Sequence, residues 1–254
     1  MQQPALPQSF LQAPIAHRGL HNLSQGIPEN SLAAFDAAIA RGYGIELDLQ
    51  LSRDGVAMVF HDYGLERLTG EKGPIAQQSA AALGKITLTG GTEGIPTLAE
   101  TLAYVAGRAP LLIELKDQDG ALGPNIGPLE EATVKALTGY AGDVALMSFN
   151  PHSVAALARL APDHARGLTT CDYRPEDWPT IPKTRLAELR PIPDFIRTGA
   201  SFISHQASDL TRAPVTALKA QGVPVLCWTI RSRAQEDAAR QIADNVTFEG
   251  YAPA

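Results

Sequence analysis

The sequence predicts an α/β protein, a (β/α)8 TIM barrel with a short insertion after the second strand. Short apolar runs alternate with helical patterns along all 254 residues. One hairpin aside, the alternation is strict and yields eight strands, the number that closes a parallel sheet into a barrel. Reactive side chains also gather where these strands end, as they do at the mouth of such a barrel. An open doubly wound sheet is the alternative fold.

Nine segments have the composition and length of strands. In chain order they are Pro14–His17, Gly44–Ser52, Val56–His61, Leu111–Lys116, Asp143–Phe149, Arg166–Thr170, Phe202–His205, Pro224–Thr229 and Asn245–Glu249. The third begins directly after Ser52-Arg53-Asp54-Gly55, which is a tight-turn sequence, so we expect a hairpin there. The other eight are separated by helical patterns, which predicts a parallel sheet with right-handed crossovers.

Helical patterns fill the connections between the parallel strands. They cover Ser31–Arg41, Leu98–Gly107, Pro128–Thr138, Pro151–Leu160, Thr184–Leu189, Leu210–Gln221 and Arg233–Ala243, with a short helix at Ser79–Leu83. Asn30, Thr97 and Asn150 stand where N-terminal caps belong. Glycines that suit helix C-termini stand at positions 42, 107 and 222.

Two connections lack a strong pattern. Residues 63–96 are rich in glycine, and we interpret them as an irregular insertion over the barrel mouth. Residues 172–193 are rich in proline and form a second irregular connection. Because no linker or internal repeat divides the chain, we expect residues 1–254 to form a single barrel domain.

The composition is that of a soluble globular protein, with 44% hydrophobic and 19% charged residues. A net charge of −6 without a basic run argues against nucleic acid or an anionic membrane as a partner. Residues 1–11 do not resemble a secretory signal, and no apolar stretch approaches the roughly 20 residues that span a bilayer. Cys171 and Cys227 are therefore expected to be reduced thiols in a cytoplasmic protein. The oligomeric state is left open.

Two acidic side chains in the second predicted strand point the same way, because residues two apart in a strand share a face. They are Glu46 and Asp48. Glu114 stands near the end of the next parallel strand and brings a third carboxylate. Three such groups repel one another unless a cation lies between them, so we expect one divalent ion, Mg²⁺ or Ca²⁺. The alternatives are a solvated strand face for the first pair and a simple ion pair between Glu114 and Lys116.

The first and third predicted strands each end in a histidine. His17 is followed by Arg18, whose fixed charge suits a phosphate or carboxylate, and His61 is followed by Asp62. Two imidazoles beside one substrate atom provide the general base and the general acid that split an ester. The alternative role for both histidines is to brace their loops by hydrogen bonding.

Several further residues are expected near the barrel mouth. Glu29 and Asn30 open the first helix, where they either line the site in a supporting role or simply cap the helix. Trp228 ends the seventh parallel strand and forms either an apolar wall for a substrate or part of the core. Glu249 ends the last strand and either forms a hydrogen bond at the rim or acts as a weak ligand. His205 is expected to pack in a loop.

A metal ion, two histidines, Arg18 and Lys116 together suit a small phosphodiester as substrate. Positive groups stabilise charge on the non-bridging oxygens, while the histidines exchange protons with the attacking and departing oxygens.

In its motifs the chain resembles the glycerophosphodiester phosphodiesterase family. The matching residues, in order, are His17-Arg18-Gly19, Pro28-Glu29-Asn30-Ser31, Glu46-Leu47-Asp48, His61-Asp62, Leu65–Thr69 with Arg67 and Thr69, Glu114-Leu115-Lys116 and Trp228-Thr229. No single motif is specific, but their order and spacing are.

The resemblance implies a (β/α)8 barrel and hydrolysis of glycerophosphodiesters to glycerol 3-phosphate and an alcohol. It implies metal ligation by Glu46, Asp48 and Glu114, an acid–base pair of His17 and His61, and phosphate binding by Arg18 and Lys116. In part of the wider superfamily a substrate hydroxyl attacks phosphorus instead and gives a cyclic phosphate.

The chain departs from the family pattern at two positions. Arg231 stands where the family often has asparagine, and Phe248-Glu249 replaces a Thr-Asp pair. Both departures concern substrate preference. The functional alternatives are a lysophospholipase D-like or cyclising lyase activity on lysophospholipids and, less favoured, a barrel that binds a phosphorylated ligand without catalysis.

Overall fold

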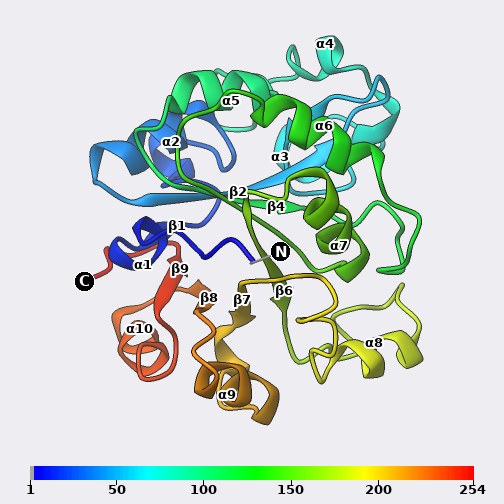
Figure 1. Cartoon of the computed structure of the whole chain (residues 1–254). Coiled ribbons are helices and arrows are strands. Elements are labelled where there is room, and N and C mark those ends of the chain that lie inside the picture. The colour runs from blue at the N-terminus through cyan, green and yellow to red at the C-terminus, as the bar shows by residue number, and fades with distance from the viewer. Residues whose placement is uncertain (1–2) are drawn as a thin grey trace.

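The computed structural model describes residues 3–254, and its eight parallel strands close into a barrel (Figure 1). The strands are β1 (Ile15–Ala16), β2 (Gly44–Leu51), β4 (Leu111–Leu115), β5 (Val144–Ser148), β6 (Ala165–Thr170), β7 (Phe202–Gln206), β8 (Val225–Ile230) and β9 (Asn245–Phe248). Each pairs with its neighbour in the order β1-β9-β8-β7-β6-β5-β4-β2, and β1 pairs with β2 to close the ring. The TIM-barrel prediction is confirmed.

The remaining strand, β3 (Ala57–Val59), is the expected hairpin partner of β2. It runs antiparallel to β2, with Leu49 opposite Val59. The turn is closed by a hydrogen bond of 3.0 Å from the Ser52 amide to the Val56 carbonyl, and Gly55 supplies the left-handed conformation (φ 77°) that the turn needs.

Within residues 3–254, seven helices of at least seven residues lie outside the strands, as Figure 1 shows. They are α2 (Leu32–Ala40), α5 (Leu98–Val105), α6 (Pro128–Leu137), α7 (Pro151–Leu160), α8 (Lys183–Leu189), α9 (Ala213–Ala220) and α10 (Arg233–Ala239). The largest differences from expectation concern α9 and α10. The α9 helix starts three residues late, because the 3-10 turn η3 (Ala207–Asp209) precedes it and Pro214 lies in its first turn. The α10 helix ends four residues early, where the chain turns back toward β9.

Two of the three predicted helix caps are confirmed. The side chain of Thr97 accepts a hydrogen bond from the Glu100 amide, and that of Asn150 accepts one from the His152 amide. The prediction that Asn30 caps the first helix is wrong, because Ser31 caps it. Asn30 instead has a left-handed backbone (φ 54°) and turns its side chain away from the helix.

The end of the barrel opposite the predicted site is closed by the N-terminal segment. The short helix α1 (Ser9–Gln12) buries Phe10 completely among apolar side chains from inside the barrel. These are Ile15, Leu112, Ala145, Met147, Ala165, Phe202 and Leu226. Asn245 at the start of β9 donates hydrogen bonds to the carbonyls of Phe10 (2.8 Å) and Ala13 (2.6 Å), which fastens the plug to the barrel wall.

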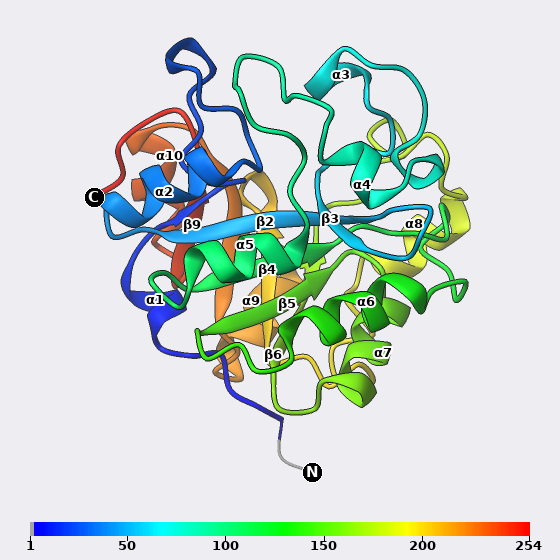
Figure 2. The same cartoon turned by 90° about the horizontal axis from the view of Figure 1, so that it is seen from above.

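The insertion after β3 has more structure than the sequence suggests. It contains α3 (Glu66–Thr69), the 3-10 turn η2 (Ile75–Gln77) and the predicted short helix, α4 (Ala80–Leu83). Its apolar side chains pack with Met58 and Phe60 into a separate small core of Leu65, Leu68, Ile75, Leu83, Leu88 and Ile95. In Figure 2, α3 and α4 lie on the right of the view and α1 lies on the left, on the opposite side of the barrel. Residues 3–254 include no helix that is both long and apolar enough to span a bilayer.

Candidate active site

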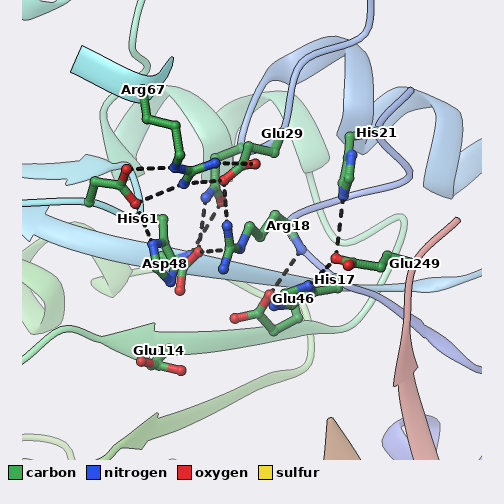
Figure 3. A network of polar contacts seen from close by, with 12 residues as sticks. His17, Arg18, His21, Glu29, Glu46, Asp48, His61, Arg67, Glu114 and Glu249 are labelled. Atoms are coloured by element: carbon green, nitrogen blue, oxygen red, sulfur yellow. Dashed lines mark hydrogen bonds and ion pairs between the residues drawn. The ribbon is translucent and has the colours of Figure 1, made fainter. Parts of the chain in front are cut away.

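Three carboxylates meet inside the barrel, two from the middle of β2 and one from the end of β4 (Figure 3). Asp48 and Glu114 lie opposite each other in the strand register, and Glu46 lies one pleat before Asp48 on the same face. One oxygen from each carboxylate lies within 4.8 Å of the others, and all three side chains are buried. The predicted convergence of these residues is therefore observed, and the group can hold a metal ion.

The positive charge around these carboxylates is uneven. Lys116 places its Nζ 2.8 Å from Asp48 Oδ1 and 2.7 Å from Glu114 Oε1. Burial opposes ionisation of Asp48, but Lys116, His61 and Arg18 outweigh it and hold its pKa well below the ordinary value. Among residues 3–254, the hydrogen bond that the Glu46 carboxylate accepts comes from the backbone N–H of Arg18, at 2.9 Å. Burial, followed by repulsion from Asp48 and Glu114, raises the pKa of Glu46 well above its usual range. A cation at this point would relieve that repulsion, and oxygen donors of this kind fit a hard divalent ion.

Two backbone turns, at Arg18 and at Asn30, bring these residues against β2. Arg18 and Asn30 both have left-handed conformations (φ 55° and 54°), which are uncommon outside glycine and accumulate at functional sites. The Asn30 amide donates to the Arg18 carbonyl at 2.9 Å and joins the two turns. The side-chain amide of Asn30 donates to Asp48 Oδ2 at 3.0 Å, so the residue supports a carboxylate rather than the helix.

His17 is held from the rim of the barrel. Its Nδ1 lies 2.7 Å from Glu249 Oε2 at the end of β9. Burial lowers the pKa of His17, although the hydrogen bond to Glu249 acts in the opposite direction. The contact with His17, followed by that with His21, lowers the pKa of Glu249, so this carboxylate stays ionised. Glu249 thus fulfils the expected rim hydrogen bond, and it does not belong to the group of three carboxylates.

His61 is held in the same way from the other side of the site. Its Nδ1 lies 2.6 Å from Asp62 Oδ1, the side chain of the next residue. Asp62 in turn accepts two hydrogen bonds from Arg67 of α3. The Nε of Arg67 lies 2.7 Å from Asp62 Oδ2, and its Nη2 lies 2.7 Å from Oδ1. Each candidate catalytic imidazole is therefore fixed at Nδ1 by a carboxylate, and no hydrogen bond engages either Nε2 within residues 3–254.

Arg18 lies between the three carboxylates and the segment that leads into α2. Its Nη1 contacts Glu29 Oε1 at 2.6 Å, and its Nε lies 3.4 Å from Asp48 Oδ2. Glu29 is also bound by Arg67, so the residue predicted to play a supporting role is the junction of two arginines (Figure 3).

The two departures from the family pattern contact each other. The Nε of Arg231 lies 2.6 Å from Glu249 Oε1, while the other oxygen of Glu249 accepts from His17. The arginine is 60% exposed at the rim, so the longer acidic side chain and the unusual arginine form one unit beside the histidine. Nothing in the sequence alone links these positions.

A cavity of about 180 Å³ connects these groups. It is lined by both histidines, all three carboxylates, Arg18, Lys116, Met147, Phe149, Ser204, Trp228, Thr229, Arg231 and Thr247. Trp228 packs edge-on against Phe149 with the ring centroids 5.5 Å apart, which places an aromatic wall opposite the charged one. His205, by contrast, is fully buried against Thr170 and Asp209 and does not line the cavity, as expected for a packed histidine.

The contacts of three residues beside the site were not predicted from the sequence, although Asp62 and Arg67 belong to motifs named there. Asp62 orients His61, Arg67 binds Asp62 and Glu29, and His21 Nε2 lies 3.8 Å from Glu249. Asp62 had a local signal, since it directly follows His61. The partners of Arg67 and His21 are set by packing across the barrel mouth.

Comparisons with known proteins agree with this fold and site. The model of the glycerophosphoryl diester phosphodiesterase family matches residues 17–247. A glycerophosphodiester phosphodiesterase of Caldanaerobacter subterraneus subsp. tengcongensis is 30% identical over 242 residues, which cover 91% of this chain and 90% of that protein.

Two solved structures illustrate the likeness in three dimensions. A phosphodiesterase of Oleispira antarctica, in complex with the product sn-glycerol-3-phosphate, has a TM-score of 0.74 and 27% identity, covering 95% of this chain and 94% of that one. A glycerophosphodiester phosphodiesterase of Parabacteroides distasonis has a TM-score of 0.72 and 23% identity, covering 92% and 91%. The second likeness concerns the fold alone.

Proposed function

The chain belongs to the glycerophosphoryl diester phosphodiesterase family, and we propose that it hydrolyses glycerophosphodiesters with a divalent cation and two histidines. The observation that carries this proposal is the pairing of His17 with Glu249 and of His61 with Asp62 around one cavity. The same cavity contains the three convergent carboxylates. The expected products are glycerol 3-phosphate and an alcohol, and the Oleispira relative was solved with the first of these bound.

Glu46, Asp48 and Glu114 are the proposed ligands of the cation. Their crowding in a buried position supports this assignment, because the local positive charge does not offset the effects of burial and of the other two carboxylates on Glu46. When bound, the ion would supply positive charge for the non-bridging phosphate oxygens. Mg²⁺ and Ca²⁺ both prefer such oxygen donors, and the assay below discriminates between them.

The two histidines are proposed to move the protons. A carboxylate that accepts the Nδ1–H of an imidazole favours the tautomer whose Nε2 carries a lone pair. In that state one histidine takes a proton through Nε2 from the attacking group, which is water in direct hydrolysis and a substrate hydroxyl in the cyclising route. The other, protonated, gives its Nε2 proton to the departing alkoxide. Glu249 and Asp62 stabilise the charged form of whichever imidazole carries the extra proton.

Arg18 and Lys116 are proposed to bind the phosphate, and Trp228 to bound the space for the rest of the substrate. The guanidinium of Arg18 and the Nζ of Lys116 line the cavity on either side of Asp48, so both positive groups can face a phosphate oxygen. Lys116 also balances two carboxylates, which reduces the net charge that a substrate phosphate would meet.

The decisive assay follows release of glycerol 3-phosphate from glycerophosphocholine by chelated protein supplied with Mg²⁺ or Ca²⁺. We expect activity only after a cation is added, and a loss of kcat of at least roughly 100-fold for His17→Ala and for His61→Ala. His164→Ala is the matched control, since His164 lies outside the cavity and should retain activity.

Full turnover in chelator, or by folded His17→Ala, would contradict the proposal. The products discriminate between the chemical routes. A cyclic phosphate that accumulates would favour the cyclising alternative over direct hydrolysis, and release of choline from lysophosphatidylcholine would indicate activity on lysophospholipids. Binding of glycerol 3-phosphate without any turnover would leave only the non-catalytic barrel.

A further inference from the structure

We propose that Arg67, a residue of the insertion, is a positioning residue that fixes the orientations of His61 and Arg18 together. This inference rests on the proposed function for its kinetic consequences. A chain of contacts through Arg67 of α3 joins His61 to Arg18 (Figure 3).

The first half of the chain holds His61. The Nε and Nη2 of Arg67 lie 2.7 Å from the two oxygens of Asp62, a fork-to-fork contact that fixes the carboxylate plane. Asp62 Oδ1 accepts from His61 Nδ1 at 2.6 Å. Because the carboxylate cannot turn without breaking a contact to Arg67, the imidazole that it binds is also held.

The second half holds Arg18. The Nη1 and Nη2 of Arg67 lie 3.0 Å from the two oxygens of Glu29. Glu29 Oε1 lies 2.6 Å from Arg18 Nη1. One guanidinium therefore makes two bidentate contacts, and each of its carboxylate partners in turn orients a residue that lines the cavity.

An ordinary surface ion pair would not fix the orientations of His61 and Arg18. Arg67 is 48% exposed, and exposed pairs typically add only about 0–1 kcal/mol to stability. Its partners are less accessible, at 14% for Glu29 and 24% for Asp62, and both are shared with a second partner from the site. We therefore expect the arginine to matter for geometry much more than for folding.

The backbone of Arg67 is itself well fixed. Its neighbours Leu65 and Leu68 are buried in the small core of the insertion. The hydroxyl of Thr69 donates to the Leu65 carbonyl at 2.7 Å and closes the turn of α3. The insertion thus provides a rigid support from which one side chain reaches across to the site.

Arg67→Lys and Arg67→Ala test the inference in the full-length protein with its cation. Lysine keeps the charge but lacks the planar fork, so we expect kcat/KM to fall in both variants, by about 10- to 100-fold. The melting temperature should stay within about 2 °C of the wild type. Arg233→Ala is the matched control, because Arg233 is an exposed arginine that pairs with one exposed carboxylate, Asp237, and does not line the cavity. Values of kcat/KM within twofold of the wild type for both Arg67 variants would overturn the inference.

The tautomer of His61 tests the positioning role of Arg67 independently of enzymatic activity. In ¹⁵N-histidine NMR spectra, with the His61 signals assigned from a His61→Gln variant, we expect a single tautomer protonated at Nδ1. Arg67→Ala should convert it into a mixture, whereas Arg233→Ala should leave it unchanged. An unchanged His61 ring in Arg67→Ala would refute the positioning role.

The two proposals fail in different ways. If wild-type protein with either cation does not hydrolyse glycerophosphodiesters, the proposed function fails, while a tautomer change in Arg67→Ala would still support the positioning role. If the wild type is active and both Arg67 variants match it in rate and in the His61 spectrum, only the positioning role fails.

Discussion

Glu46 is a residue at which folding and function make opposite demands. It lies beside Asp48 and Glu114 in a buried position, and the attraction of Lys116 and the hydrogen bond from the Arg18 backbone N–H compensate its charge incompletely. Burial and these neighbours raise its pKa well above the ordinary value of 4.5. Such a carboxylate opposes folding once it is ionised, yet it is the kind of group that a divalent cation needs.

Glu46→Gln should therefore stabilise the protein in chelator while removing its response to metal. A raised folded-state pKa means that the wild type loses stability as pH rises above 4.5, and glutamine removes that loss. We expect the melting temperature of the variant in chelator to exceed that of the wild type by a few degrees at pH 8 and to match it near pH 4.

Thermal melts with and without Mg²⁺ provide the control for this prediction. The wild type should gain stability on addition of metal, as any ligand of the native state confers, and Glu46→Gln should gain much less. A lower melting temperature for the variant than for the wild type in chelator at pH 8 would contradict the prediction.

Whether the role of a single site residue could be predicted depended on how far away in sequence its contact partners lie. Glu46 and Asp48 share a face through strand periodicity alone, so their pairing was evident from the sequence. Asn30 looked like a helix cap because local hydrogen bonding favours that role, but its backbone is left-handed and its amide binds Asp48. Glu249 and Arg231 each looked like an isolated departure, and only the fold brings them into contact.

Among the strands, β6 and β7 illustrate a constraint that residue types alone did not indicate. Gly167 of β6 lies inside the barrel beside Phe202 of β7. A Cβ on Gly167 would lie 2.4 Å from the phenyl ring, so glycine is needed for the ring to fill the interior.

Gly167→Ala is expected to destabilise the fold by about 1–3 kcal/mol, as overpacking of a core usually does. Denaturant melts measure this loss. Gly84→Ala is the control, since the nearest atom to its added Cβ lies at 3.5 Å, an ordinary contact.

A second substitution tests the proposed cause of the Gly167→Ala loss. Phe202→Leu should recover part of the stability in the double variant, because the smaller side chain makes room for the new methyl group. Strict additivity of the two losses would mean that the ring is not what glycine accommodates.

At the level of helices and strands, the sequence predicted features reliably where the contacts that form them join residues close in sequence. Thr97 and Asn150 cap their helices as predicted, since the cap contacts lie within three residues. The insertion was harder to interpret. Its apolar residues follow no single period, because they face a small core of their own rather than one side of a regular helix.

Across the whole molecule, stability and chemistry lie at opposite ends of the barrel. Phe10 and α1 fill one end, whereas the carboxylates, histidines and insertion surround the other. Figure 2 shows α1 and the insertion helices α3 and α4 on opposite sides of the barrel. Such separation lets the end with the candidate site hold crowded charges while the opposite end supplies apolar burial.

Phe10→Ala should thus cost about 3–5 kcal/mol of stability and leave kcat unchanged at 25 °C, where the protein remains folded. Calorimetry should register a fall in melting temperature of roughly 10 °C. Leu160→Ala, at a 39% exposed position on α7, should change little by comparison. A matching fall in kcat for Phe10→Ala in fully folded protein would show that the two ends are coupled.

The sequence by itself determined the alternation of strands and helices, the barrel and the residue types at the strand ends, because periodicity and strand direction depend on neighbouring residues. Tertiary structure alone decided that Glu249 holds His17 and that Arg67 meets Glu29, whereas Asp62, which holds His61, is its neighbour in sequence. His17 and Glu249 are 232 positions apart, and Arg67 and Glu29 are 38 apart. Such contacts exist only after the ring closes, when side chains of the rim meet across it, and no local pattern encodes that meeting.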